Sequence, residues 1–298
     1  MVHLDRRGDI SIAEIVVYVP VLIVSVMLVL RHGFTRRAGW IFLCILSIIR
    51  IVGGITHIVS EQNPSNVTLQ IVFATLEGAG VSPLLLATLG FLQTVCQGSL
   101  DDHPLMTRGL RLMGLLGIVA LALTIAGGVK AGTATTEANM NSGTNLRHIG
   151  VILFAVLFGL VFLMHLFCWS NRARLMRYRR TLLAGISGAL PFLAVRVAYT
   201  VLSAFAPATR SISPSGQSTP VTSSSPLAKF NSTQGSWVVY LCMSVLPEFL
   251  TVLVYLVVGT RIPLQQDTDY ARGLQTDAWE DEETARLKPM SLGSEYTH

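Results

Sequence analysis

The sequence predicts an all-α fold: a polytopic membrane bundle of seven transmembrane helices, with the N-terminus outside and the C-terminus in the cytosol. Of the 298 residues, 51% are hydrophobic and only 13% are charged, whereas a soluble domain carries about 25% charged residues. The apolar residues form seven runs of about 20 residues or more, the length that crosses a bilayer as a helix. Basic residues lie beside the ends of these runs and not on one soluble face, which argues against nucleic-acid binding.

The expected spans divide the chain into a membrane domain, residues 10–260, and two polar ends. Residues 1–9 are expected to be a short extracytoplasmic N-terminus, because the apolar run after them is too long for a signal peptide. The Ser/Thr-rich stretch 206–236 is expected to be an outer loop without a fold of its own, and the acidic stretch 261–298 a disordered cytosolic tail. The spans are predicted at about 10–30, 40–60, 67–95, 110–129, 148–169, 181–205 and 237–259.

The first three spans each carry polar side chains within an apolar run. The first contains Glu14 near the outer surface. The second places Arg50 and His57 on one helical face, because they are two turns apart. The third contains Glu77 in its middle, and Pro83 is expected to interrupt its backbone hydrogen bonds, which neighbouring helices can satisfy.

Of the remaining spans, the fourth is apolar and the last three carry polar side chains. The fourth has almost no polar side chain and is expected to face lipid at the periphery. The link after it, 130–147, is rich in Thr, Asn and Gly and is expected to be a flexible loop. The fifth carries His165 near its far end, the sixth carries Arg196, and the seventh carries Glu248.

Basic residues and glycosylation sequons favour the same orientation. The links expected inside carry more Arg and Lys near the membrane than the outer segments do, as the positive-inside rule requires, although Arg6 and Arg7 run against it. Two sequons, at Asn66 and Asn231, fall outside in this topology, and both are candidate glycosylation sites.

Five arginines lie between residues 172 and 180, in the link between the fifth and sixth spans. We expect this run to set the topology and to attract anionic lipid, at about 1 kcal/mol per residue. The alternative is that the run docks a cytosolic partner or the chain's own acidic tail.

Four charged residues are expected in the central part of the bilayer: Arg50, Glu77, Arg196 and Glu248. An ionised side chain at that depth costs roughly 2.5–3.5 kcal/mol on insertion scales, so such residues face the bundle interior and pair. Pairs between consecutive spans are the simplest, Arg50 with Glu77 and Arg196 with Glu248, and crossed pairs satisfy the same charges. The group is either a set of salt bridges that fixes helix register or a functional polar site.

Candidate neighbours of this charged hub are His57, Tyr199, Tyr255 and Glu14. The sequence contains no nucleophilic triad, phosphate loop, metal cluster or nucleotide fingerprint, so catalytic residues are unknown and no metal or cofactor is predicted. The four cysteines show no zinc-type spacing, and no disulfide framework is expected. The expected partners are the lipid bilayer and a small lipophilic ligand, in the plasma membrane or an endomembrane.

Three functions fit these features. The first is a receptor-like or sensory protein, in which a ligand contacts the hub and the basic link at 172–180 transmits the resulting conformational change. The second is a membrane-embedded enzyme acting on a lipophilic substrate, such as a terpenoid cyclase with Glu77 or Glu248 as general acid. The third is a transporter, which is less favoured because no inverted repeat is visible.

Several short motifs stand out in the expected spans: Leu76-Glu77-Gly78, Pro83-Leu-Leu-Leu86, Arg177-Tyr178, Pro191-Phe-Leu-x-x-Arg196-x-x-Tyr199 and Leu246-Pro247-Glu248. Together they resemble a fungal seven-span integral membrane family that is catalogued as a domain of unknown function. The resemblance covers roughly residues 10–260 and implies the fold, but no mechanism. The layout is also similar to that of receptor-like fungal seven-span proteins, although Asp-Arg-Tyr after the third span, Asn-Pro-x-x-Tyr in the seventh and an outer cysteine pair are absent.

Overall fold

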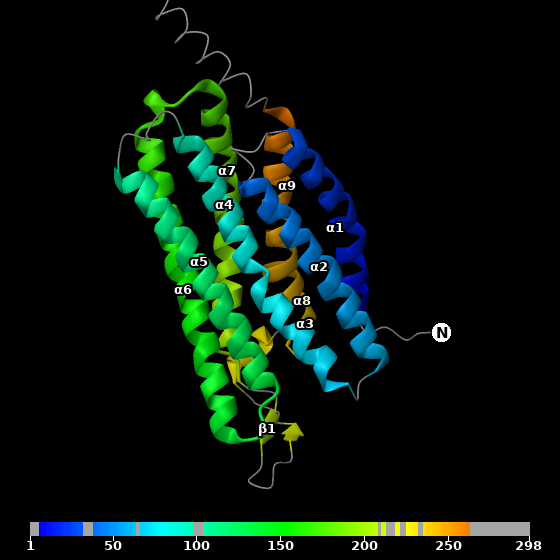
Figure 1. Ribbon diagram of the computed structural model, residues 1–298. Helices are drawn as coiled ribbons and strands as arrows, with labels where there is room; N and C mark the ends of the chain where they lie inside the picture. Colours follow the sequence, from blue (N-terminus) through cyan, green and yellow to red (C-terminus); the bar gives the residue numbers. More distant parts are fainter. Residues whose placement is uncertain are drawn as a thin grey trace, which may run out of the picture.

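The chain forms a bundle of long helices (Figure 1). Seven helical segments are long and apolar enough to cross a membrane within the described residues, which confirms the predicted helical class and number of spans. The chain is therefore a multi-pass membrane protein. The predicted tail beyond residue 262 and the first five residues lie outside the described part of the chain. The computed structural model describes residues 6–31, 38–63, 66–97, 104–207, 210–212, 218–220, 225–231 and 235–262.

Within these residues, some spans are continuous helices and two are interrupted. The continuous helices are α1 (Arg6–Arg31), α2 (Ala38–Gln62), α5 (Pro104–Gly132), α6 (Glu137–Ser170) and α7 (Arg177–Ala204). The third span consists of α3 (Val67–Ala79) and α4 (Val81–Cys96). The last span consists of α8 (Trp237–Tyr240), the π-helical turn η4 (Leu241–Val245) and α9 (Leu246–Arg261).

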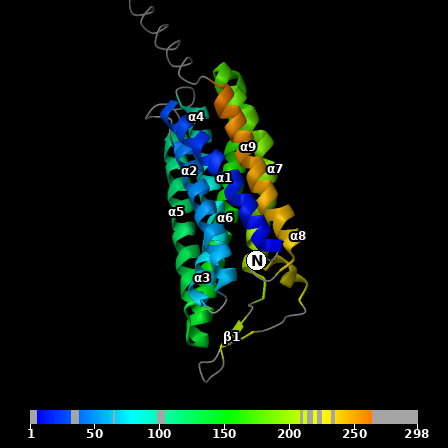
Figure 2. The same ribbon diagram turned by 90° about the vertical axis from the view of Figure 1, so that its right-hand side faces the viewer.

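Successive spans run in opposite directions, so the links alternate between two ends of the bundle (Figure 1 and Figure 2). We call the end where α1 begins the N-terminal end. It also carries the α2–α3 and α5–α6 links. The opposite end, where α9 finishes, is called the C-terminal end, and it carries the α6–α7 link.

The predicted outer loop contains three short elements at the N-terminal end. β1 (Arg210–Ile212) pairs antiparallel with β2 (Ser218–Pro220). A 3-10 turn, η3 (Pro226–Phe230), follows, and the Ser225 hydroxyl caps it by accepting from the Leu227 N–H at 3.3 Å. The loop was expected to have no structure of its own. These elements add a small hairpin to an otherwise helical fold.

The segment 130–147 is helical except for a short turn at 133–136, so the prediction of a flexible loop was wrong. α5 continues to Gly132, and α6 begins at Glu137. Thr136 is the N-cap of α6, and its hydroxyl accepts from the Asn139 N–H at 3.4 Å. The two helices are joined by a tight turn, and α6 extends about 50 Å at 1.5 Å per residue, beyond a hydrocarbon core of about 30 Å.

Close packing of α5 against α6 explains why this segment is helical. A Cβ atom added to Gly143 would lie 2.4 Å from the backbone nitrogen of Ala131, and one added to Gly127 would lie 2.4 Å from the backbone nitrogen of Arg147. Small residues that let backbones approach are a main device of helix packing in membranes. This packing outweighs the loop-like composition of the segment.

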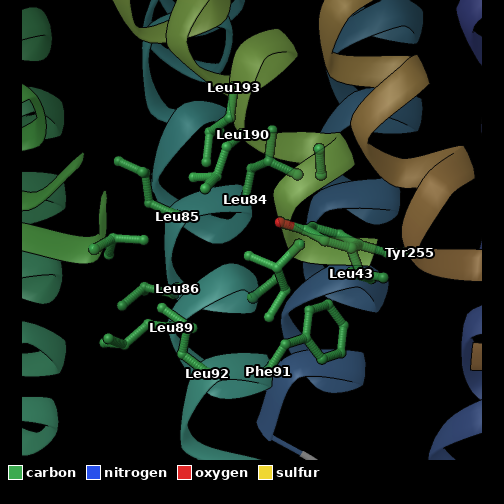
Figure 3. Close-up of a cluster of buried hydrophobic side chains, with 14 of the residues drawn as sticks. Leu43, Leu84, Leu85, Leu86, Leu89, Phe91, Leu92, Leu190, Leu193 and Tyr255 are labelled. Atoms are coloured by element: carbon green, nitrogen blue, oxygen red, sulfur yellow. The ribbon is translucent and has the colours of Figure 1, made fainter. Parts of the chain in front are cut away.

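The apolar core is organised around α4, whose side chains are almost all buried. Figure 3 shows Leu84 and Leu85 of α4 close to Leu190 and Leu193 of α7. The outer helices instead turn apolar side chains away from the bundle. On α5, which was predicted to face lipid, Leu112 is 65% exposed. In a membrane such side chains contact acyl chains.

Cys96 of α4 and Cys168 of α6 meet near the C-terminal end. Both are buried and unoxidised, and their Sγ atoms are 3.2 Å apart. We expect mild oxidation with copper phenanthroline to join them, because little movement is needed for a disulfide. After denaturation, a maleimide reagent should then modify only Cys44 and Cys242. A Cys96→Ser variant should lose the effect, and modification of every cysteine after oxidation would contradict this packing of α4 on α6.

Candidate functional site

The four charged residues predicted in the middle of the membrane lie together at the centre of the bundle. Arg50 comes from α2, Glu77 from α3, Arg196 from α7 and Glu248 from α9. Each is at most 4% exposed. Four helices therefore turn the charged group in the middle of each apolar run inward, away from lipid.

Arg50 bridges both glutamates. Its Nε and Nη2 atoms donate to the two carboxylate oxygens of Glu248, in a bidentate pair. Its Nη1 atom donates to Oε2 of Glu77. The planar guanidinium matches a carboxylate in this way and fixes its orientation as well as its charge.

Arg196 bridges the same two glutamates from the other side. Its Nε donates to Glu248 Oε2 at 2.9 Å, and its Nη2 donates to Glu77 Oε1 and to the Glu77 carbonyl, both at 3.2 Å. Its Nη1 donates to the Thr200 hydroxyl at 3.1 Å. The structure thus contains the predicted pairs and the crossed pairs at once, as a closed network that we call the hub.

Three hydroxyl groups complete the hub. Tyr18 of α1 donates to Glu248 Oε1 at 2.9 Å. Tyr240 and Ser244 donate to the two oxygens of Glu77, at 3.1 Å and 2.7 Å. Every carboxylate oxygen of Glu77 and Glu248 therefore accepts two hydrogen bonds. Buried charges are tolerated when their geometry is good and their remaining lone pairs are satisfied, as they are here.

Two backbone interruptions shape the hub. Gly80 separates α3 from α4, and a Cβ atom there would lie 3.0 Å from Nη2 of Arg50, so a larger residue would require the guanidinium to shift. This break agrees with the predicted interruption by Pro83, because its missing N–H leaves the carbonyl four residues earlier, that of Ala79 at the end of α3, without a helical donor. The π-helical turn η4 ends just before Pro247 and Glu248. Such turns are frequent at functional sites.

Glu14 of α1 lies at the edge of the hub. It is 5% exposed, and its Oε1 lies 3.9 Å from Nη1 of Arg50. Within the described residues, Oε1 has no hydrogen bond. Glu14 is thus a third carboxyl group next to the hub. It lies within ion-pair distance of Arg50 but makes no hydrogen bond to it.

The other predicted neighbours differ in their positions. Tyr199 is close, because its ring centroid lies 5.8 Å from Cζ of Arg196. His57 instead contacts Ser11, through Nδ1 at 3.0 Å, and packs on Phe73. The hydroxyl of Tyr255 contacts Thr88 at 2.7 Å, in the apolar core (Figure 3). His57 and Tyr255 are therefore outside the hub.

A small cavity lies beside the hub, between α3, α6 and α7. It has room for about one water molecule. Sites for drug-sized ligands enclose about 300–1,000 Å³, so this cavity accepts a small group and not a whole lipophilic molecule. It is lined by Glu77, Gly78, Arg147, Val151, Arg196, Tyr199, Thr200 and Ser203.

Several residues of the site were not assigned to it from the sequence. Tyr18 and Ser244 were expected on the same helical faces as Glu14 and Glu248, four residues away in each case, but not as members of the hub. The role of Tyr240 could not be predicted from the sequence, because tyrosine is common near the ends of membrane spans. The role of Arg147 could not be predicted either, because it fell in the segment expected to be a loop.

The two sequons lie at the same end of the bundle. Asn66 is exposed at the start of α3, at the N-terminal end. Asn231 follows η3 and is half-buried, and its Nδ2 donates to the carbonyl of Pro207 at 3.3 Å. Asn66 is therefore the more accessible of the two.

Some arginines of the basic α6–α7 link at the C-terminal end contact other parts of the fold. Its first arginines form a 3-10 turn, η2 (Arg172–Arg174). Arg180 donates to the carbonyls of Leu175 and Ala173, at 2.8 Å and 2.9 Å. Arg179 is buried at 2% exposure, whereas Arg172 is exposed. Of the arginines described in this link, Arg179 is therefore turned into the fold, and Arg172 and Arg180 remain exposed.

Within the described residues, no group of three or more His, Cys, Asp or Glu side chains is placed to hold a metal ion.

Comparisons with known proteins identify a family but no characterised relative. No curated protein and no solved structure matches the chain. A family model described as "Domain of unknown function (DUF7702)" matches residues 4–265, and the chain therefore belongs to the DUF7702 family.

Proposed function

We propose that this protein is a receptor-like or sensory membrane protein whose hub couples the two ends of the bundle. One observation carries the proposal: each hub arginine bridges both hub glutamates, so that a single network joins four helices. Ionisable residues inside a membrane are costly and mark functional sites. Packed networks of this kind have discrete arrangements and do not deform continuously.

The surroundings of the hub support a role in conformational change. The hub contacts both interrupted spans. Arg50 lies beside Gly80 in the third span, and Ser244 of the π-helical turn η4 in the last span donates to Glu77. Interrupted helices are where backbone geometry can change at low cost. A displacement of α9 relative to α7 would break the Arg196–Glu248 contact and leave both charges buried without each other.

The same contacts give little support to the enzyme alternative. A general acid needs a carboxyl oxygen within reach of the substrate. All oxygens of Glu77 and Glu248 already accept two hydrogen bonds from hub residues. The cavity beside them has room for about one water molecule, which is too small for a terpenoid.

For orientation, we propose that the N-terminal end faces outward. The C-terminal end carries the basic α6–α7 link, and both sequons lie at the opposite end. When the full chain is expressed in a eukaryotic secretory system, we expect peptide N-glycosidase to increase its gel mobility, and Asn66→Gln to abolish the shift. Asn231→Gln is the matched comparison. Glycan attached to an asparagine introduced next to Arg172 would contradict this orientation.

The sensory proposal is tested by distances at the C-terminal end. Spin labels are attached to cysteines at exposed positions 108 on α5 and 261 on α9, with Cys44 and Cys242 replaced by serine. The purified chain in nanodiscs is then compared with an Arg196→Ala/Glu248→Ala variant. That variant keeps the Arg50–Glu77 pair and removes the link between α7 and α9. We expect a second distance population in the variant.

The matched control removes a buried contact outside the hub. Thr88→Ala/Tyr255→Phe breaks a hydrogen bond of 2.7 Å between α4 and α9. We expect this variant to keep the native distance distribution. An unchanged distribution in the folded Arg196→Ala/Glu248→Ala variant would contradict the proposal, because the hub would then serve only to fix helix register.

A further inference from the structure

The cavity between α3, α6 and α7 carries an excess of positive charge. Arg147 and Arg196 line it, and one carboxylate, Glu77, faces them. That carboxylate is already shared by Arg50 and Arg196. Arg7 adds to the positive field on this side, because its Cζ lies 5.6 Å from the ring of Tyr240, a hub residue. The electrostatics of the cavity therefore favour an anion.

Two polar groups that line the cavity are unsatisfied within the described residues. Arg147 makes no hydrogen bond or ion pair there, in contrast to both hub arginines. Tyr199 is 2% exposed, and its hydroxyl has no hydrogen bond partner. Buried polar groups nearly always have partners, because an unsatisfied one costs about 1–3 kcal/mol. The buried Tyr199 hydroxyl thus points to a missing component, and the half-buried Arg147 places a positive charge in the same cavity.

The chemistry of the missing component follows from the two groups that would bind it, the Arg147 guanidinium and the Tyr199 hydroxyl. A guanidinium has only donors, and a tyrosine hydroxyl can donate one hydrogen bond. One acceptor can therefore bond to both groups, and the positive charge of Arg147 favours an acceptor that is negative. The cavity limits its size, since it has room for about one water molecule.

We propose that this cavity binds a single small anionic group, a halide ion or the carboxylate end of an amphipathic ligand, held by Arg147 and Tyr199. This inference deepens the proposed function by naming the ligand class, and it rests on that function only for the consequence of binding. Bound beside Arg196 and Glu77, the anion would compete with Glu77 for the Arg196 guanidinium. The site would in this way be coupled to the hub.

The test uses the full chain in nanodiscs of uncharged lipid, in sulfate buffer at constant ionic strength. Sodium chloride replaces sulfate in one titration, and sodium decanoate is added in a second, with decanol as the uncharged comparison. The readout is the midpoint of thermal unfolding, which a ligand of the folded state raises in a saturable way. We expect saturation with chloride or with decanoate.

The variants locate the site. Tyr199→Phe should weaken apparent affinity about tenfold, because it removes one hydrogen bond to a charged group. Arg147→Gln should abolish saturable binding. Arg111→Gln is the matched control, since Arg111 is an exposed arginine on α5, and it should bind as the native chain does. If Arg147→Gln does not fold, Tyr199→Phe carries the test.

Each outcome is informative. A response to chloride identifies a halide site, and a response to decanoate but not to chloride or decanol identifies a carboxylate site. No saturable response to either anion, or a response that Tyr199→Phe and Arg147→Gln leave unchanged, overturns the proposal. Binding that leaves the spin-label distances at the C-terminal end unaltered keeps the site and contradicts the sensory function.

Discussion

Replacement of Glu248 by alanine is expected to destabilise the folded protein by about 3–5 kcal/mol, the cost of breaking a buried ion pair from one side. The substitution leaves Arg50 without its bidentate partner and Arg196 with Glu77 as its one remaining carboxylate, while Tyr18 loses an acceptor. The measurement is an SDS titration of the purified chain in mixed micelles, followed by circular dichroism. The midpoint should fall well below that of the native chain.

Glu61→Ala is the matched control for this prediction. Glu61 is also a glutamate on a membrane helix, and its Oε1 lies 3.8 Å from His57 Nε2, but its side chain is 20% exposed near the end of α2. Partly exposed ion pairs of this kind contribute about 0–1 kcal/mol. Equal midpoints for Glu248→Ala and Glu61→Ala would mean that the hub does not stabilise the bundle.

A single methyl group on Gly143 should have the second large effect. The added Cβ would lie 2.4 Å from the backbone nitrogen of Ala131 and 2.9 Å from the carbonyl oxygen of Gly127. Because those atoms are backbone, α5 and α6 must separate, and overpacking of this kind costs about 1–3 kcal/mol. The same SDS titration of Gly143→Ala should show it.

The same substitution elsewhere on α6 should have the opposite sign. A Cβ atom on Gly159 meets nothing within 4 Å. Alanine there should stabilise the helix by about 0.5–1 kcal/mol, since glycine loses more backbone entropy on folding. If Gly143→Ala stabilises as Gly159→Ala does, the close crossing of α5 and α6 is absent.

The composition of the hub was predictable from the sequence because a charge within an apolar run has few physical solutions. Arg50, Glu77, Arg196 and Glu248 each interrupt a run long enough to cross a bilayer, so they had to meet. Their exact pairing was not predictable. A guanidinium has five donors in a fork, and whether it serves one carboxylate or two depends on the relative position of four helices.

The interruption of the third span was predictable only in part. Proline removes the hydrogen bond to the carbonyl four residues earlier, and α3 ends at Ala79, four residues before Pro83. The close approach of Arg50 to Gly80 was not predictable, because Arg50 comes from another helix and would lie 3.0 Å from a Cβ atom at position 80. A contact between segments far apart in sequence leaves no local signal.

The segment 130–147 shows that composition can mislead where packing decides. Thr, Asn and Gly are frequent in loops because they adopt turns readily. Here Thr136 caps a helix, and the glycines admit a neighbouring backbone. Since the segment was taken as a loop, Arg147 was not recognised as a side chain facing the interior. The candidate anion site could therefore not be predicted from the sequence.

The most direct test of the hub is a double-mutant cycle on Arg50 and Glu248. The free energies of unfolding of the native chain, Arg50→Ala, Glu248→Ala and the double variant are measured by the same SDS titration. The bidentate contact predicts that the double variant is more stable than the sum of the single losses implies, by about 1.5 kcal/mol or more. Additive losses, within about 0.5 kcal/mol, would show that the two side chains do not meet.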